Sequence, residues 1–220
     1  MAAEAMKEAV RIAIGRVAVD ADLSVPDRAT GLVVFAHGSG SSRFSRRNRA
    51  VAAALESAGF GTLLLDLLTP DEESVDERTR EHRFDIEMLG ERVVGAIDWI
   101  RTRPELRGLP VALFGASTGA AAALIAAAAR PEAVGAVVSR GGRPDLADKA
   151  LPNVQAPTLL IVGGHDEPVI EMNRNAMRRM HAPVQLEIVP GATHLFEERG
   201  ALEQVTRLAT DWFRHHLGKT

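Results

Sequence analysis

Cysteine is absent from the 220 residues, and this absence excludes three kinds of site. The chain can form no disulfide framework, hold no metal through thiolates and use no cysteine nucleophile. The HExxH motif of zinc proteases and an Asp-rich calcium loop are also missing from the sequence. We therefore expect no metal and no cofactor, and any nucleophile must belong to another residue type.

Long apolar runs and a large net charge are absent as well. Glu4, Lys7, Glu8 and Arg11 interrupt the alanine-rich N-terminal segment, so we expect no secretory signal peptide. The most apolar later run, residues 120–129, is too short to span a bilayer. A net charge of -3 gives no reason to expect nucleic acid or a membrane as partner. We expect a cytoplasmic monomer or homodimer that acts on a small molecule.

The arrangement of apolar residues indicates an α/β protein. The length and a hydrophobic content of 46% fit one domain over residues 1–220. Short apolar runs alternate with helical patterns, which predicts a mostly parallel sheet with helices on both faces. The expected strands are 10–19 and 23–25 (an N-terminal hairpin), 32–36, 62–66, 111–114, 134–138, 158–162 and 185–189. The expected helices are 48–58, 84–102, 118–130, 169–180 and 201–217. The charged segment 69–83 is expected either to border the pocket as a flap or to form a solvent-exposed connection, and the sequence favours neither.

A candidate nucleophile follows one of these strands directly. Ligands of such sheets bind beyond the carboxyl ends of the strands, so reactive residues are expected there. The segment Gly115-Ala116-Ser117-Thr118-Gly119 fits the G-x-S-x-G nucleophile elbow, with an apolar strand before it and a helix after it. Its small residues allow a tight turn from which the serine hydroxyl projects. We identify Ser117 as the candidate nucleophile.

A base and an acid follow two later strands in the expected order. Serine needs a histidine base that is itself oriented by an acid, and in this fold the chain order is Ser, Asp or Glu, His. Asp166 follows the strand 158–162 and His194 follows the strand 185–189. Glu167 is a less suitable acid, because the preceding Gly-Gly turn favours a short side chain close to the strand. The other histidines do not follow a strand at the required place.

Two backbone amides are expected to stabilise the oxyanion. One is the N–H of Thr118, the residue after the nucleophile, and the other comes from the loop after an early strand. The glycine loop, which we define as residues 37–42 (His-Gly-Ser-Gly-Ser-Ser), occupies that place, and we assign the second donor to Ser39. His37 is expected to brace this loop rather than to act as a second base.

Arginines near the expected site have two interpretations. Arg140 follows the strand 134–138 and is expected to reach the active-site rim, where it would orient a substrate. A cluster of four arginines begins the helix after the glycine loop. The favoured interpretation is a solvated basic face, and the alternative is attraction of an anionic substrate. The cluster comprises Arg43, Arg46, Arg47 and Arg49.

The chain resembles the dienelactone hydrolase branch of the α/β hydrolases over nearly its whole length. The resemblance is strongest at FGASTGAAAAL, LLIVGGHDEPV and VPGATHLFEE. It implies the α/β-hydrolase fold without a large lid domain, and the triad Ser117, Asp166 and His194. The namesake enzymes of this family use a cysteine nucleophile, whereas this chain has serine there. The resemblance therefore implies a serine hydrolase of small esters, thioesters or lactones rather than a dienelactone substrate.

Two alternatives stay open at this stage. A peptidase or an acyltransferase uses the same triad, so the sequence does not separate them from an esterase. A binding protein on the same fold is the alternative outside catalysis. Such proteins usually lack one member of the triad, whereas all three residues are in place here.

Overall fold

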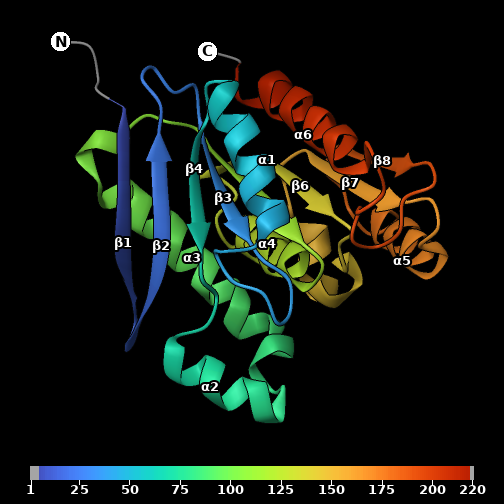
Figure 1. Cartoon of the computed structure of the whole chain (residues 1–220), viewed down its shortest axis with the longest axis horizontal. Helices are drawn as coiled ribbons and strands as arrows, with labels where there is room; N and C mark the ends of the chain where they lie inside the picture. The colour runs from blue at the N-terminus through green and yellow to red at the C-terminus, as the bar shows by residue number, and fades with distance from the viewer. Residues whose placement is uncertain (1–4, 219–220) are drawn as a thin grey trace.

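The structure, a computed structural model, describes residues 5–218, which form an eight-stranded sheet flanked by helices (Figure 1). The strand order is β1-β2-β4-β3-β5-β6-β7-β8. All neighbours from β4 to β8 run parallel, and only the pairs β1–β2 and β2–β4 are antiparallel. The strands are β1 (Met6–Ile14), β2 (Val17–Val25), β3 (Leu32–Ala36), β4 (Gly61–Leu65), β5 (Val111–Ala116), β6 (Val134–Arg140), β7 (Thr158–Gly163) and β8 (Val184–Val189). The predicted α/β-hydrolase architecture is confirmed.

The helices cover both faces of the sheet, as the sequence predicts. On one face pack α3 (Ile86–Thr102), α4 (Thr118–Ala129) and the 3-10 segment η3 (Pro144–Asn153); the other face is covered by α1 (Arg46–Ser57) and α6 (Ala201–Leu217). Two separate apolar clusters result, one on each side of the sheet. The central strands β3, β4 and β5 are buried along their whole length, which explains why their sequences are almost entirely apolar.

The N-terminal hairpin differs from its prediction. The expected strand 10–19 is wrong, because the chain turns back at Gly15 and Arg16 and Ile14 pairs with Val17. Gly15 has φ +60°, which a tight two-residue hairpin requires and glycine adopts at little cost. The apolar residues change from even to odd positions across this turn, from Ile12 and Ile14 to Val17 and Val19. This change of position is the feature of the sequence that indicates the turn.

A helix was missed within the charged segment 69–83. Residues Pro70–Thr79 form α2, and His82–Phe84 add a 3-10 turn, η1. The hydroxyl of Thr69 accepts from the Glu72 amide while the Glu72 carboxylate accepts from the Thr69 amide, which is a capping box. The sequence Thr69-Pro70-Asp71-Glu72 carries this signal, with proline at the first helical position. In Figure 1, α2 lies beyond the carboxyl ends of β3 and β4.

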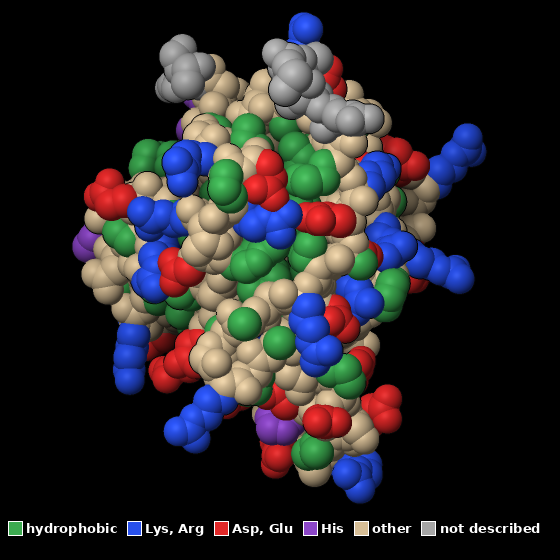
Figure 2. Space-filling view, turned by 90° about the vertical axis from the view of Figure 1, so that its left-hand side faces the viewer, with side chains coloured by type: hydrophobic (Ala, Val, Ile, Leu, Met, Phe, Trp, Pro, Cys, Tyr) green, Lys and Arg blue, Asp and Glu red, His purple; other side chains and the backbone are tan. Residues whose placement is uncertain are grey.

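The exposed edge of the sheet carries charges. Lys7, Glu8 and Arg11 lie on the edge strand β1, and Figure 2 shows basic and acidic side chains mixed with apolar ones on this face. Charged side chains on an edge strand oppose pairing with a second chain. Among residues 5–218, no helix combines the length and the apolar character needed to cross a membrane.

The glycine loop is fixed between β3, β4 and the start of α4 by two features. A Cβ added to Gly119 would lie well inside van der Waals contact of the carbonyl oxygens of Ala36 and His37. The buried His37 ring accepts a hydrogen bond at Nε2 from the Leu67 amide, at 3.1 Å. Its Nδ1 must then carry the proton, which it donates to the Gly38 carbonyl at 2.9 Å. His37 is therefore a neutral brace between the loop and the end of β4.

Replacing Gly119 with alanine should destabilise the fold strongly. The added methyl group meets backbone atoms of the glycine loop, which cannot rotate away as a side chain can. We expect Gly119→Ala to lower the free energy of unfolding by about 3 kcal/mol, which is the upper end of the range for substitutions that overpack a protein interior. Urea denaturation measures this change. A loss below about 1 kcal/mol would mean that the helix and loop separate more easily than the structure implies.

Acid should weaken the His37 brace. Burial lowers the pKa of His37, so between its folded and unfolded pKa values the unfolded chain binds the proton more readily. The stabilisation is therefore complete above the unfolded value of about 6.5 and is lost as pH falls toward the folded value. Denaturation midpoints should fall from pH 7 to pH 5.5 more steeply for the wild type than for His37→Gln. The matched control His181→Gln, at an exposed site, should follow the wild type; parallel curves for the wild type and His37→Gln would contradict this.

Candidate active site

Ser117 lies in a strained turn between β5 and α4. Its φ of +51° and ψ of −122° place it in a region that non-glycine residues rarely adopt. Small neighbours make this turn possible, since a Cβ on Gly115 would lie 2.7 Å from the Ala120 nitrogen. A Cβ on Gly38 would similarly lie 3.1 Å from the Ser117 Cβ. Such stored strain is typical of functional positions, and it presents the hydroxyl beyond the sheet edge.

Asp166 and His194 form a hydrogen-bonded pair. The His194 Nδ1 lies 2.6 Å from the Asp166 Oδ2, and the two side chains are 37% and 14% exposed. A carboxylate can only accept, so Nδ1 carries a proton, and in the neutral ring the lone pair is then on Nε2. The pair therefore holds the imidazole in the tautomer that a general base requires.

The loops that carry this pair are packed tightly together. Asp166 begins α5 (Glu167–Met177), directly after β7, and the His194 loop follows β8. The His165 amide donates to the Ala192 carbonyl at 2.9 Å, and a Cβ on Gly163 would lie 2.6 Å from the Thr193 oxygen. Glycine at position 163 is therefore required for the two loops to meet.

Ser117 and His194 border the same short segment after β6. The Ser117 amide donates to the Arg140 carbonyl at 3.2 Å, and the Ser117 carbonyl accepts from the Arg143 amide at 3.1 Å. On the other side, the His194 Cε1 lies 3.6 Å from the point where a Gly141 Cβ would be. The serine, base and acid predicted from sequence thus lie along adjacent strand ends of the sheet, with the strands β5, β6, β7 and β8 in that order.

The other candidates for the acid and the base lie outside the hydrogen-bonded pair of Asp166 and His194. Glu167 and His165 are exposed neighbours of Asp166, His181 is exposed after α5, and His215 is exposed on α6. His82 lies 3.7 Å from Glu81 in η1. Within residues 5–218, none of these side chains forms a hydrogen bond or an ion pair with Asp166 or Ser117.

The two predicted oxyanion donors are neighbours. The Ser39 and Thr118 hydroxyl oxygens lie 2.9 Å apart and share a hydrogen bond, which brings the glycine loop against the start of α4. Thr118 is the first residue of α4, and the first amides of a helix have no partner within it. The positive end of the α4 dipole adds to the local field that would favour an oxyanion.

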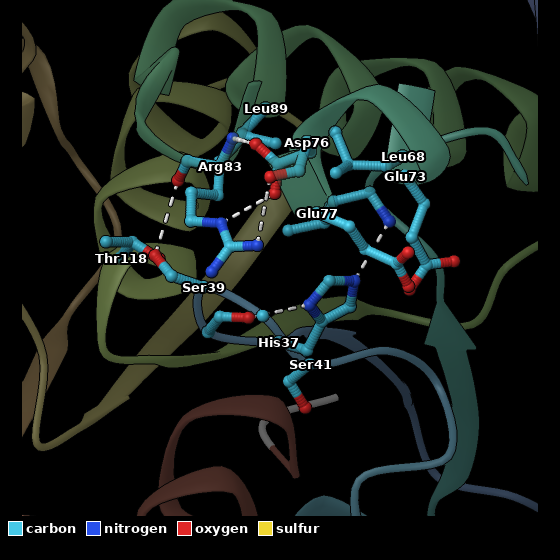
Figure 3. A pocket seen from close by; sticks show the side chains of 13 residues that line it. His37, Ser39, Ser41, Leu68, Glu73, Asp76, Glu77, Arg83, Leu89 and Thr118 are labelled. Atoms are coloured by element: carbon cyan, nitrogen blue, oxygen red, sulfur yellow. Dashed lines mark hydrogen bonds and ion pairs between the residues drawn. The ribbon is translucent and has the colours of Figure 1, made fainter. Parts of the chain in front are cut away.

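A pocket opens beside these two residues (Figure 3). It encloses about 100 Å³ between the glycine loop and the α2–η1 segment, with Leu67, Leu68 and Leu89 as its apolar residues. Its charged residues come from the segment 69–83, for which a flap at the pocket and a solvent-exposed connection were equally plausible from the sequence. The structure favours the first of these alternatives, because Glu73, Asp76, Glu77 and Arg83 line the pocket.

Arg140 does not lie on the exposed rim, where the sequence had placed it. Only 7% of the residue is exposed, and its Nη2 donates to the Asn48 Oδ1 of α1 at 3.3 Å. Burial, followed by the like charge of Arg47, lowers the pKa of Arg140 to about 10. The error arose because alternate residues of β6 point to opposite faces of the sheet, and Arg140 points toward α1. Its role in orienting a substrate stays a prediction.

Most of the arginine cluster is neutralised by carboxylates. Arg43 pairs with both Asp66 and Asp22, and Arg49 pairs with Asp22 at 2.7 Å. Arg47 pairs with Glu197 at 3.0 Å. These pairs support the interpretation of a solvated face over attraction of an anionic substrate.

Comparisons with known proteins agree with this geometry. The family model described as "Dienelactone hydrolase family" matches residues 19–217. A dienelactone hydrolase crystal structure from Anabaena variabilis has 56% identity and a TM-score of 0.94, covering 97% of this chain and 99% of that one. Est1E from Butyrivibrio proteoclasticus, at 17% identity, has a TM-score of 0.80 over 96% of this chain and 99% of its own, which is a likeness of fold.

A longer relative matches as well. A protein of Mycobacterium tuberculosis strain H37Rv, provisionally named a phosphoribosyl transferase, is 57% identical over 210 residues. The match covers 96% of this chain but 46% of that protein, so the chain spans about half the length of this relative. Since the family model matches almost the whole sequence, the chain belongs to the dienelactone hydrolase family.

Proposed function

We propose that this protein is a serine hydrolase that cleaves ester, thioester or lactone bonds of small molecules. The observation that carries the proposal is the 2.6 Å hydrogen bond between Asp166 and His194, at strand ends adjacent to the strained Ser117 turn. Membership of the family and the 56% identical dienelactone hydrolase support a hydrolase. The phosphoribosyl transferase name belongs to a relative of which this chain spans less than half, and we propose no such activity here.

The proposed reaction proceeds in two halves. The Ser117 oxygen attacks the substrate carbonyl carbon while the His194 Nε2 takes the hydroxyl proton, and the amides of Ser39 and Thr118 stabilise the oxyanion. The bond to the leaving group breaks as His194 returns the proton to the leaving oxygen or sulfur. A water molecule, deprotonated by His194, then attacks the acyl-enzyme, and the proton goes back to Ser117 as the acid departs. Asp166 keeps the imidazole oriented and stabilises its charged form.

Removing the nucleophile should abolish ester cleavage. We expect wild-type protein to hydrolyse p-nitrophenyl acetate and to react with a fluorophosphonate at Ser117. Ser117→Ala should lower kcat on the order of 10⁶-fold and eliminate labelling, as expected when an activated serine is lost. Absence of both hydrolysis and labelling in folded wild-type protein would instead favour a binding protein on this fold.

The acid can be tested against its neighbour. Asp166→Asn keeps the shape of the side chain but can hold the wrong tautomer of His194, so kcat should fall on the order of 10⁴-fold. The matched control Glu167→Gln removes the adjacent, exposed carboxylate and should keep kcat within about twofold, as expected for a group away from the reaction. Kinetics on p-nitrophenyl acetate compare the two. Equal losses in both variants would refute Asp166 as the acid of the triad.

A further inference from the structure

The pocket beside the oxyanion donors has a defined position relative to the proposed reaction. Ser39 and Thr118 both line it, so its opening borders the place where the carbonyl oxygen would sit. His194 and the rest of its loop are not among the lining residues. The leaving oxygen must lie within reach of His194 to receive its proton. Ser117 is not a lining residue either, but Gly38 and Thr118, which lie beside it, are. A substituent in this pocket points away from His194, as an acyl chain would and a leaving group would not.

Arg83 lines the pocket beside the glycine loop. Figure 3 shows its guanidinium between Asp76 and the loop. The Nη1 lies 3.2 Å from the point where a Cβ on Gly40 would be. Because Gly40 has no side chain, the guanidinium can approach the backbone of the loop closely.

Asp76 holds Arg83 in this position. The Asp76 carboxylate, on a residue only 2% exposed, accepts from the Arg83 Nε at 2.6 Å and from the Arg83 amide at 2.9 Å. These donors keep the pKa of the Asp76 carboxyl below its usual value although burial opposes this. The Arg83 carbonyl also accepts from the Ser39 hydroxyl at 3.3 Å, which ties η1 to an oxyanion residue. Two contacts thus fix the wall of the pocket relative to the reacting carbonyl.

The volume indicates what the pocket accepts. Its 100 Å³ is smaller than an apolar cavity of about 150 Å³, which accommodates benzene. A short aliphatic chain fits against Leu67, Leu68 and Leu89, whereas an aromatic ring or a long chain meets Arg83.

We propose that this is the acyl pocket and that Arg83, clamped by Asp76, is the specificity-determining residue that restricts the enzyme to short aliphatic acyl groups. This inference rests on the proposed function. It adds that the acyl half of the ester is selected and that the Arg83 side chain limits the size of the acyl group.

The test is the ratio of kcat/KM for p-nitrophenyl hexanoate to that for the acetate. Because both values refer to the same sample, the ratio does not depend on the fraction of folded enzyme. Arg83→Ala alone leaves the buried Asp76 charge unpaired and can destabilise the fold. The double variant Asp76→Asn with Arg83→Ala removes both charges and keeps an oxygen acceptor for the Arg83 amide. Arg78→Ala, an exposed arginine on α2, is the matched control.

In the wild type the ratio should be below one, and benzoate should be cleaved poorly. Each methylene that gains a buried site is worth about fourfold, so the double variant should raise the ratio about tenfold or more. Arg78→Ala should leave the ratio unchanged. An unchanged ratio in the double variant, or equal wild-type cleavage of acetate, octanoate and benzoate, would overturn the acyl-pocket assignment alone. Absence of Ser117-dependent cleavage of every ester would overturn the proposed function together with this inference.

Discussion

The site depends on one close approach of backbone to backbone, where the start of α4 meets the end of β3. Gly119 has no room for a side chain against the carbonyl oxygens of Ala36 and His37, and Gly115 has none against Ala120. This approach allows Ser117 to adopt its positive φ and brings Thr118 beside Ser39. The same contact therefore positions the proposed nucleophile and both proposed oxyanion donors. Rigid placement of this kind is what a preorganised site requires, because groups already in position need no reorganisation during the reaction.

Two further contacts extend this constraint across the sheet. The His37 brace links the glycine loop to the end of β4, from which the chain continues into α2. The close packing at Gly163 links the Asp166 loop to the His194 loop. The loops of the site are thus positioned by close backbone packing and by the hydrogen bond of a neutral imidazole, while the Asp166–His194 and Asp76–Arg83 pairs orient side chains. Exposed ion pairs on the surrounding surface contribute little to stability by comparison.

The sequence predicted what depends on local pattern and missed what depends on side-chain direction. Strand runs followed by Ser117, Asp166 and His194 gave the fold and the relevant loops, because parallel strands must end at a common edge. The burial of Arg140 was not predictable in the same way, since one residue of register decides which face of β6 it occupies. The helix α2 was missed because charge dominated its composition, although Thr69, Pro70 and Glu72 carried the capping signal. The charged residues of the pocket lining lie on or beside that helix, and the sequence left open whether they border the pocket.

The distribution of charge argues that shape rather than electrostatic attraction selects the substrate. Arg43, Arg47 and Arg49 are each engaged by a carboxylate, and Arg83 is engaged by Asp76. Glu73 and Glu77 also line the pocket, so its surroundings offer no net positive charge to an anionic substrate. A neutral aliphatic group gains from contact with the leucines, and the two lining charges of Asp76 and Arg83 already satisfy each other. Selection by the size of the pocket is therefore the physical mechanism that this arrangement of residues favours.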